Sequence, residues 1–169
     1  GLENLSILLR LLFLLLFSPL WSVAASASGT WQKKWCVESE SDQYSVTSLG
    51  GDTLEILAPK GLTLWYRQML KGDMTAEYDA CVMDEGRDGD RLSDMNFFWM
   101  ASDPQAKDIW TRMASRKGVF ANCSQLQLYY LGYGGNYNTT TRFRRYHGEP
   151  KPPIVKEYTD ADHLLKPNH

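Results

Sequence analysis

The stretch that decides the fold reads QLQLYYLGYGGNYNTTTRFRRYH and spans residues 125–147. Residues 125–130 and 139–146 are rich in aromatic and β-branched side chains, and the glycines and asparagines between them are typical of a turn. From Trp31 onward the chain repeats this pattern, with short β-like runs separated by Gly, Asp and Asn clusters at the spacing found in β-sandwiches. We therefore predict an all-β fold, an antiparallel β-sandwich.

Further strands are expected ahead of this stretch, and Gly50-Gly51-Asp52 predicts a turn that makes Thr53–Leu57 a hairpin partner of the preceding strand. Only one helix is predicted, from about Pro104 to Met113, because Asp103-Pro104 resembles an N-cap followed by proline. The proline-rich segment 150–153 predicts an extended loop. The other predicted strands are Lys34–Glu38, Tyr44–Thr47, Leu62–Met69, Thr75–Val82 and Met95–Ala101.

The N-terminal segment Leu5–Ala27 has the features of a signal peptide, with small residues at its end that suit a cleavage site. A membrane anchor is the alternative, but only Leu11–Phe17 is continuously apolar after Arg10, well short of the roughly 20 residues that a span requires. We predict that residues 1–27 are removed, that residues 28–169 form one β-sandwich domain, and that the product is secreted or periplasmic.

The two ends of the chain suggest that the natural reading frame extends further. The sequence begins with Gly1 rather than Met, and it stops at His169 without a final apolar strand to complete a sheet. We therefore expect the β-sandwich to be incomplete at its C-terminus, which would leave a strand edge exposed.

The charge pattern excludes two classes of partner. The formal net charge is -2, and basic and acidic residues are mixed along the chain. With this balance of charges the protein has no net positive electrostatic field that would attract nucleic acid or an anionic membrane, although a local basic patch is not excluded. We expect no nucleic-acid partner, and contact with a membrane only through the export signal.

The cysteines and acidic residues suggest no resident cofactor. Cys36, Cys81 and Cys123 could form one disulfide after export, but three buried thiols are the preferred interpretation. All three histidines lie late in the chain, so no histidine metal site is predicted. The acidic loop Asp84–Asp94 could hold a structural calcium ion, yet it lacks the EF-hand spacing, and a solvated loop is favoured.

One face of the strand at residues 139–146 is suited to binding an acidic sugar. Arg142, Arg144 and Tyr146 share that face because side chains alternate along a strand. Aromatic rings stack on the flat C–H faces of sugars, and guanidinium groups pair with carboxylates through two parallel hydrogen bonds. The alternative is that the arginines decorate a solvated strand.

Two acidic residues suggest glycoside hydrolysis. Glu77 and Asp79 share one face of a predicted strand, with Cα atoms about 6.6 Å apart given the rise per residue. That spacing can place an acid and a nucleophile or base across a glycosidic bond. Carboxylates paired with Arg67 or Arg142, or facing water, are the alternative.

A polysaccharide lyase is the other catalytic hypothesis, because it must neutralise a uronate carboxylate and remove the neighbouring proton. Candidate bases are Tyr130, Tyr133, Tyr146 and His147. Candidate substrate-binding residues are Arg67, Gln68, Asn136, Arg142, Arg144 and Tyr146.

Three segments together resemble a known family. Glu77–Ala80, Arg91–Pro104 and Leu128–Tyr146 resemble domain-of-unknown-function family 6250 (DUF6250), secreted bacterial proteins similar to concanavalin A-like jelly rolls. Members usually continue beyond Pro167-Asn168, so the resemblance also implies an incomplete C-terminus.

The resemblance implies an antiparallel jelly-roll β-sandwich but no assigned reaction. Jelly rolls of this kind include polysaccharide lyases, glycosidases and lectins, and a shared fold does not choose among them. We expect a carbohydrate-active secreted domain, a polysaccharide lyase or glycoside hydrolase acting on plant or uronate-containing polysaccharide. A non-catalytic carbohydrate-binding or adhesion module is the alternative.

Overall fold

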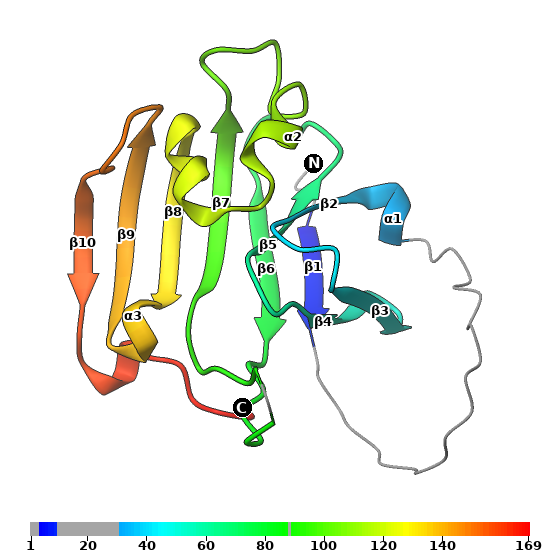
Figure 1. Ribbon diagram of the computed structural model, residues 1–169, viewed down its shortest axis with the longest axis vertical. Helices are drawn as coiled ribbons and strands as arrows, with labels where there is room; N and C mark the ends of the chain where they lie inside the picture. The colour runs from blue at the N-terminus through cyan, green and yellow to red at the C-terminus, as the bar shows by residue number, and fades with distance from the viewer. Residues whose placement is uncertain (1–3, 10–30, 88) are drawn as a thin grey trace.

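A computed structural model describes residues 4–9, 31–87 and 89–169 of the chain (Figure 1). Most of the predicted signal peptide lies outside these residues, so its removal stays a prediction. Its start, Asn4–Leu9, forms strand β1, which pairs in parallel with β6 at Thr75–Ala80. No helix within the described ranges has the length and apolar character that crossing a membrane requires.

The largest sheet has four antiparallel strands in the order β10-β9-β8-β7, which lie side by side in Figure 1. The β-rich runs at residues 125–130 and 139–146 form its central hairpin, in which Tyr130 lies opposite Arg144 and Gly132 opposite Arg142. The strands are β7 Met95–Ser102, β8 Gln127–Gly134, β9 Thr140–His147 and β10 Ile154–Tyr158.

Two antiparallel pairs make up the remaining described strands. The predicted turn at Gly50-Gly51 joins one of these pairs, with positive φ angles of 105° and 56° that glycine adopts readily. The fold is therefore mostly β, as predicted, with antiparallel sheets and few short helices. The pairs are β2 Trp35–Ser39 with β5 Leu62–Tyr66, and β3 Ser45–Gly50 with β4 Thr53–Leu57.

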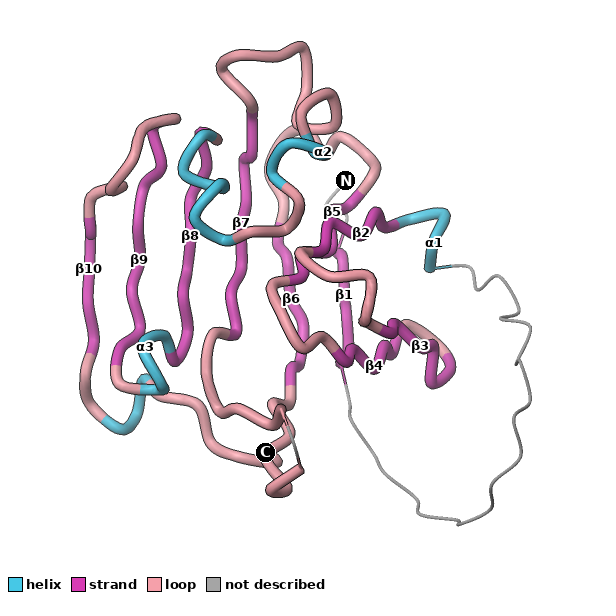
Figure 2. Tube along the Cα trace, in the orientation of Figure 1, coloured by secondary structure: helices cyan, strands magenta, loops and turns pink. Residues whose placement is uncertain are grey.

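The helix predicted at Pro104–Met113 is wrong. The segment between β7 and β8 is mostly loop, as Figure 2 shows, and its α-helix α2 covers only Met113–Arg116. Asp108 explains the interruption, because its carboxylate accepts backbone N–H bonds from Trp110 and Thr111 at 3.0 and 2.9 Å. Such local bonds offer the backbone an alternative to the helix.

The other short helices lie at the ends of strands, and two strands, β1 and β10, were missed from the sequence. The α-helices are α1 Trp31–Lys34 and α3 Gly135–Asn138, and the 3₁₀ helices are η1 Phe120–Gln125 and η2 Ala161–His163. The proline-rich segment predicted as a loop leads directly into β10. Prolines do not obstruct this strand because they precede it and because it lies at the edge of the sheet.

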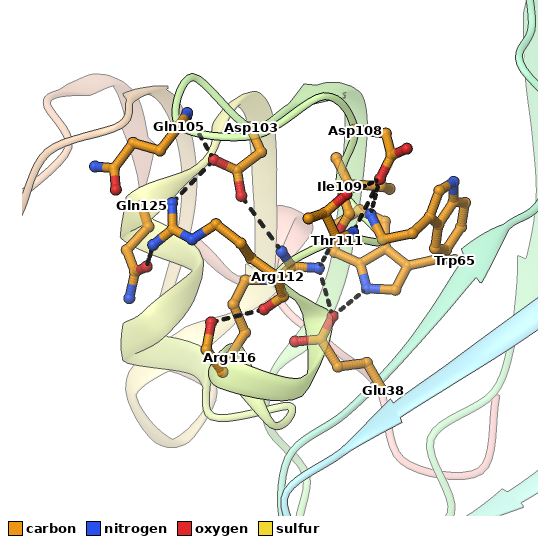
Figure 3. A network of polar contacts seen from close by, with 12 residues as sticks. Glu38, Trp65, Asp103, Gln105, Asp108, Ile109, Thr111, Arg112, Arg116 and Gln125 are labelled. Carbon is orange, nitrogen blue, oxygen red and sulfur yellow. Dashed lines mark hydrogen bonds and ion pairs between the residues drawn. The ribbon is translucent and has the colours of Figure 1, made fainter.

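A buried ion pair joins the loop segment to β2. Arg116 is 0% exposed, and its Nη2 donates to Oε2 of Glu38 at 2.9 Å (Figure 3). The same carboxylate accepts the indole N–H of Trp65 at 2.8 Å and the backbone N–H of Gly118 at 3.2 Å. Asp103 lies on the other side of the guanidinium, 3.9 Å from Nη1.

The apolar core fills the space between this ion pair and one face of the large sheet. Leu126 is fully buried, and the ring of Trp65 stacks on Phe98 of β7 with centroids 5.7 Å apart. Through Cys123, η1 packs against the buried side chains of the β8–β9 hairpin. The buried cluster comprises Trp65, Cys123, Leu126, Leu128, Tyr130 and Tyr146.

The three cysteines are all unpaired, but only one of them is buried, so the interpretation as three buried thiols holds in part. Cys123 is buried in the core, whereas Cys36 and Cys81 are half-buried. Burial raises the pKa of the Cys123 thiol to about 11, so this side chain packs as a small neutral group.

We predict that Arg116→Met lowers the free energy of unfolding by about 3–5 kcal/mol, because it leaves the Glu38 carboxylate buried without a cation. Urea denaturation followed by tryptophan fluorescence measures the change. Lys34→Gln is the control, since the Lys34–Asp52 pair is exposed and such pairs contribute less than about 1 kcal/mol. Equal losses in the two variants would contradict the assignment of Arg116.

Candidate functional site

A groove of about 540 Å³ lies on the face of β8 and β9 that also contacts η1. Side chains alternate along a strand, and this alternation brings four of the predicted substrate-binding and catalytic residues to one face of the hairpin. They are Tyr130, Arg142, Arg144 and Tyr146. Asn136 joins them from the turn between the strands. Five of the residues proposed from the sequence therefore line one cavity.

Gly132 makes room for the Tyr130 ring on the groove floor. A Cβ atom at Gly132 would lie 2.1 Å from the Tyr130 hydroxyl oxygen and 2.5 Å from Cζ, so the ring crosses directly over this glycine. The hydroxyl donates a hydrogen bond to Oδ1 of Asn96 at 3.0 Å. Tyr130 is thus fixed at both the ring and the hydroxyl.

Both groove tyrosines stay protonated at neutral pH. Burial raises the pKa of Tyr146 to about 12, and it also raises the pKa of Tyr130 above its usual range. A general base works best when its pKa lies near the working pH. These phenols are therefore hydrogen-bond donors in the resting groove rather than bases.

The two arginines are anchored by contacts at the side of the groove. Nη1 of Arg144 donates to the carbonyl oxygen of Pro152 at 2.6 Å, and Nε of Arg142 donates to the carboxylate of Glu157 on β10. A guanidinium has five N–H donors, so one anchoring contact leaves others for a ligand. The groove therefore offers two positioned cations.

Several groove residues were not found from the sequence. Asp94 lies just before β7, Phe120 begins η1, and Lys151 and Pro152 precede β10. The sequence marked Asp94 only as part of an acidic loop, and it marked the segment with Lys151 and Pro152 only as rich in proline. Loop residues carry no periodic pattern, so the sequence does not reveal which strand face they approach.

The proposed acid pair lies elsewhere. Glu77 and Asp79 share one face of β6, as predicted, but both are exposed and neither lines the groove. Neither acid forms an ion pair with Arg142, which pairs with Glu157, and their exposure agrees with the alternative that they face water. The structure therefore does not bring these acids to the predicted sugar-binding residues.

Four other candidates are also outside the groove. Tyr133 points to the opposite face of β8 and donates to the carbonyl oxygen of Leu164 at 3.0 Å, and His147 is exposed at the end of β9. Arg67 lines a second pocket of about 310 Å³, where its Nε donates to the carbonyl oxygens of residues 32 and 35. Gln68 is exposed and accepts a bond from Tyr66 at 3.2 Å.

The acidic loop is organised by its own hydrogen bonds. Asp90 accepts backbone N–H bonds from Glu85 at 2.9 Å and Arg87 at 3.1 Å, and these bonds lower its pKa, the Glu85 bond most. Across the described residues, no group of three or more His, Cys, Asp or Glu side chains is arranged to hold a metal ion. The loop geometry gives no support to the calcium hypothesis.

Comparison with known proteins identifies one family. A model described as "Domain of unknown function (DUF6250)" matches residues 56–169, a range that contains all three segments of the resemblance. Neither the curated proteins nor the solved structures include a significant match to the chain.

We predict that Gly132→Ala destabilises the protein by about 1–3 kcal/mol, because the added methyl group displaces the Tyr130 ring. Gly135→Ala is the matched control, since its Cβ would meet no atom closer than 3.6 Å in the same groove. Chemical denaturation measures both variants. Equal stability of the two variants would show that Tyr130 can move without cost.

We predict that the protein loses stability as the pH rises from about 10 to about 12. Unfolded tyrosine ionises near 10.0, whereas folded Tyr146 ionises only near 12, so the unfolded state releases its proton first. The stabilisation is complete below pH 10 and lost through this window. Phenolate absorbance should show a late transition that Tyr146→Phe removes; a titration unchanged by that variant would contradict the assignment.

Proposed function

The chain belongs to the DUF6250 family, whose description assigns no activity, and we propose from the groove that it binds an acidic carbohydrate. The observation that carries this proposal is the pair Arg142 and Arg144, which share one face of β9 and lie opposite Gly132 and Tyr130 of β8 in a groove of about 540 Å³. The ligand class is an oligosaccharide that contains uronate residues.

The chemistry of the groove favours an anionic ligand. Arg142, Arg144 and Lys151 line or rim it, while Asp94 is the one carboxylate among the lining residues. Arginine pairs with carboxylates in a planar, two-bond geometry, and its anchored position lowers the entropy lost on binding. Phe120 is 47% exposed and supplies an accessible ring for the sugar face.

Two observations favour binding over catalysis. Glycoside hydrolysis uses a pair of carboxyl groups across the scissile bond, whereas Asp94 lines the groove alone and pairs with Arg91 at 2.6 Å. The tyrosines have raised pKa values and hold their protons at neutral pH. We therefore propose the non-catalytic binding module as the leading function.

A polysaccharide lyase is the second candidate. Burial is the largest effect on the pKa of Tyr130 and raises it, but the nearby charges of Arg144 and Arg142 act in the opposite direction. In a lyase Tyr130 would be the base and the arginines would neutralise the substrate carboxylate.

We further propose a concanavalin A-like jelly roll as the fold and export as its setting. The four-stranded antiparallel sheet supports the first proposal. The apolar leader with its small-residue end supports the second.

We predict that Arg144→Gln weakens binding of a tetragalacturonate about 10- to 100-fold, because a charge-assisted hydrogen bond is lost. Isothermal titration calorimetry at low and high salt measures the affinity, which should fall with salt. Arg145→Gln is the matched control, because Arg145 is exposed on the opposite face of the same strand. It should change the affinity by less than about 2-fold.

Two outcomes would reject the proposal: equal binding of a neutral tetrasaccharide, or equal losses in the Arg144 and Arg145 variants. Release of an unsaturated uronate by the wild-type protein, abolished by Tyr130→Phe, would instead identify the lyase. Binding without such release supports the leading function.

A further inference from the structure

The turn between β8 and β9 has an unusual backbone. Three successive residues that carry a Cβ atom, Asn136, Tyr137 and Asn138, have φ angles of 52°, 56° and 57°. Asparagine visits this left-handed region readily, but a bulky aromatic residue is disfavoured there. The backbone conformation therefore gives no reason for tyrosine at position 137.

Side-chain hydrogen bonds hold the turn in this conformation. Nδ2 of Asn138 donates to the carbonyl oxygen of Leu165 at 2.9 Å, and Oδ1 of Asn138 accepts the Leu165 N–H at 2.8 Å. Within the turn, Oγ1 of Thr139 donates to the carbonyl oxygen of Asn136 at 2.7 Å. Strained backbone that is fixed by its surroundings often occurs at binding sites.

Packing does not explain Tyr137 either. Its side chain is 76% exposed, and its ring lies below the guanidinium of Arg91, with Cζ of Arg91 5.8 Å from the ring centroid. An aromatic ring stabilises a fold when its surface is removed from water. The Tyr137 ring remains in water, so it contributes little to the stability of the fold.

The exposed ring adjoins the groove. Asn136, the residue before Tyr137, lines it. Nη2 of Arg91 bonds to Oδ2 of Asp94 at 2.6 Å, and Asp94 also lines the groove. A ring and a cation therefore lie together next to two residues that line the cavity, which itself combines aromatic rings with arginines.

We propose that Tyr137 and Arg91 form a second subsite, which binds a further acidic sugar of the chain held in the groove. The ring stacks on the sugar face, and N–H groups of Arg91 that do not contact Asp94 bind the carboxylate. This inference rests on the proposed function. It adds that affinity increases with the length of the oligosaccharide.

The test compares di- and tetragalacturonate binding to the full chain by calorimetry. Tyr137→Asn removes the ring but keeps a residue that tolerates the left-handed backbone, so its thermal midpoint should equal or exceed that of the wild type. We expect tetrasaccharide affinity to fall about 3- to 10-fold and disaccharide affinity to change less than about 2-fold. Tyr137→Trp should retain tetrasaccharide binding.

Met100→Asn is the matched control, because Met100 is 75% exposed and also has a positive φ, 55°. It should leave both affinities unchanged. Equal losses for the two ligands in Tyr137→Asn, or no loss for either, would overturn the subsite. If the Arg144→Gln variant still loses binding in that case, the proposed function survives, whereas failure of the wild type to bind either ligand overturns both.

Discussion

The structure depends on one buried ion pair, Arg116 with Glu38. A charge taken out of water is costly unless it is paired and hydrogen-bonded, and the Glu38 carboxylate receives donors from Arg116, Trp65 and Gly118. These donors come from β5 and from the segment between β7 and β8. The ion pair therefore specifies where an otherwise irregular loop segment lies, which its short helices alone cannot do.

The groove follows from this placement. Arg116 fixes the position of α2, and η1 begins only a few residues later in the chain. The first residue of η1, Phe120, therefore forms one wall of the groove opposite the β8–β9 hairpin. The hairpin supplies the floor, where Gly132 lets the Tyr130 ring lie flat against the strand. A binding surface of this kind is formed before the ligand arrives, so little side-chain entropy is lost on association.

The groove and the turn beside it are built on different physical principles. In the groove, alternation along β9 places Arg142 and Arg144 on one face with no backbone strain. In the turn, the chain accepts unfavourable φ angles, and the amide of Asn138 compensates through two bonds to Leu165. The C-terminal segment thus stabilises the turn that carries Tyr137, which links a distant part of the sequence to the proposed subsite.

The sequence by itself determined most of the strands, though not β1 and β10, and it grouped Tyr130, Arg142, Arg144 and Tyr146. The period of two along a strand is a local property, and a hairpin pairs neighbouring segments, so no long-range information was needed. Tertiary structure alone decided that β6 with Glu77 lies away from the groove, and that Phe120 faces it. Those positions depend on how loops and distant strands pack against one another, and a pattern of adjacent residues does not encode such packing.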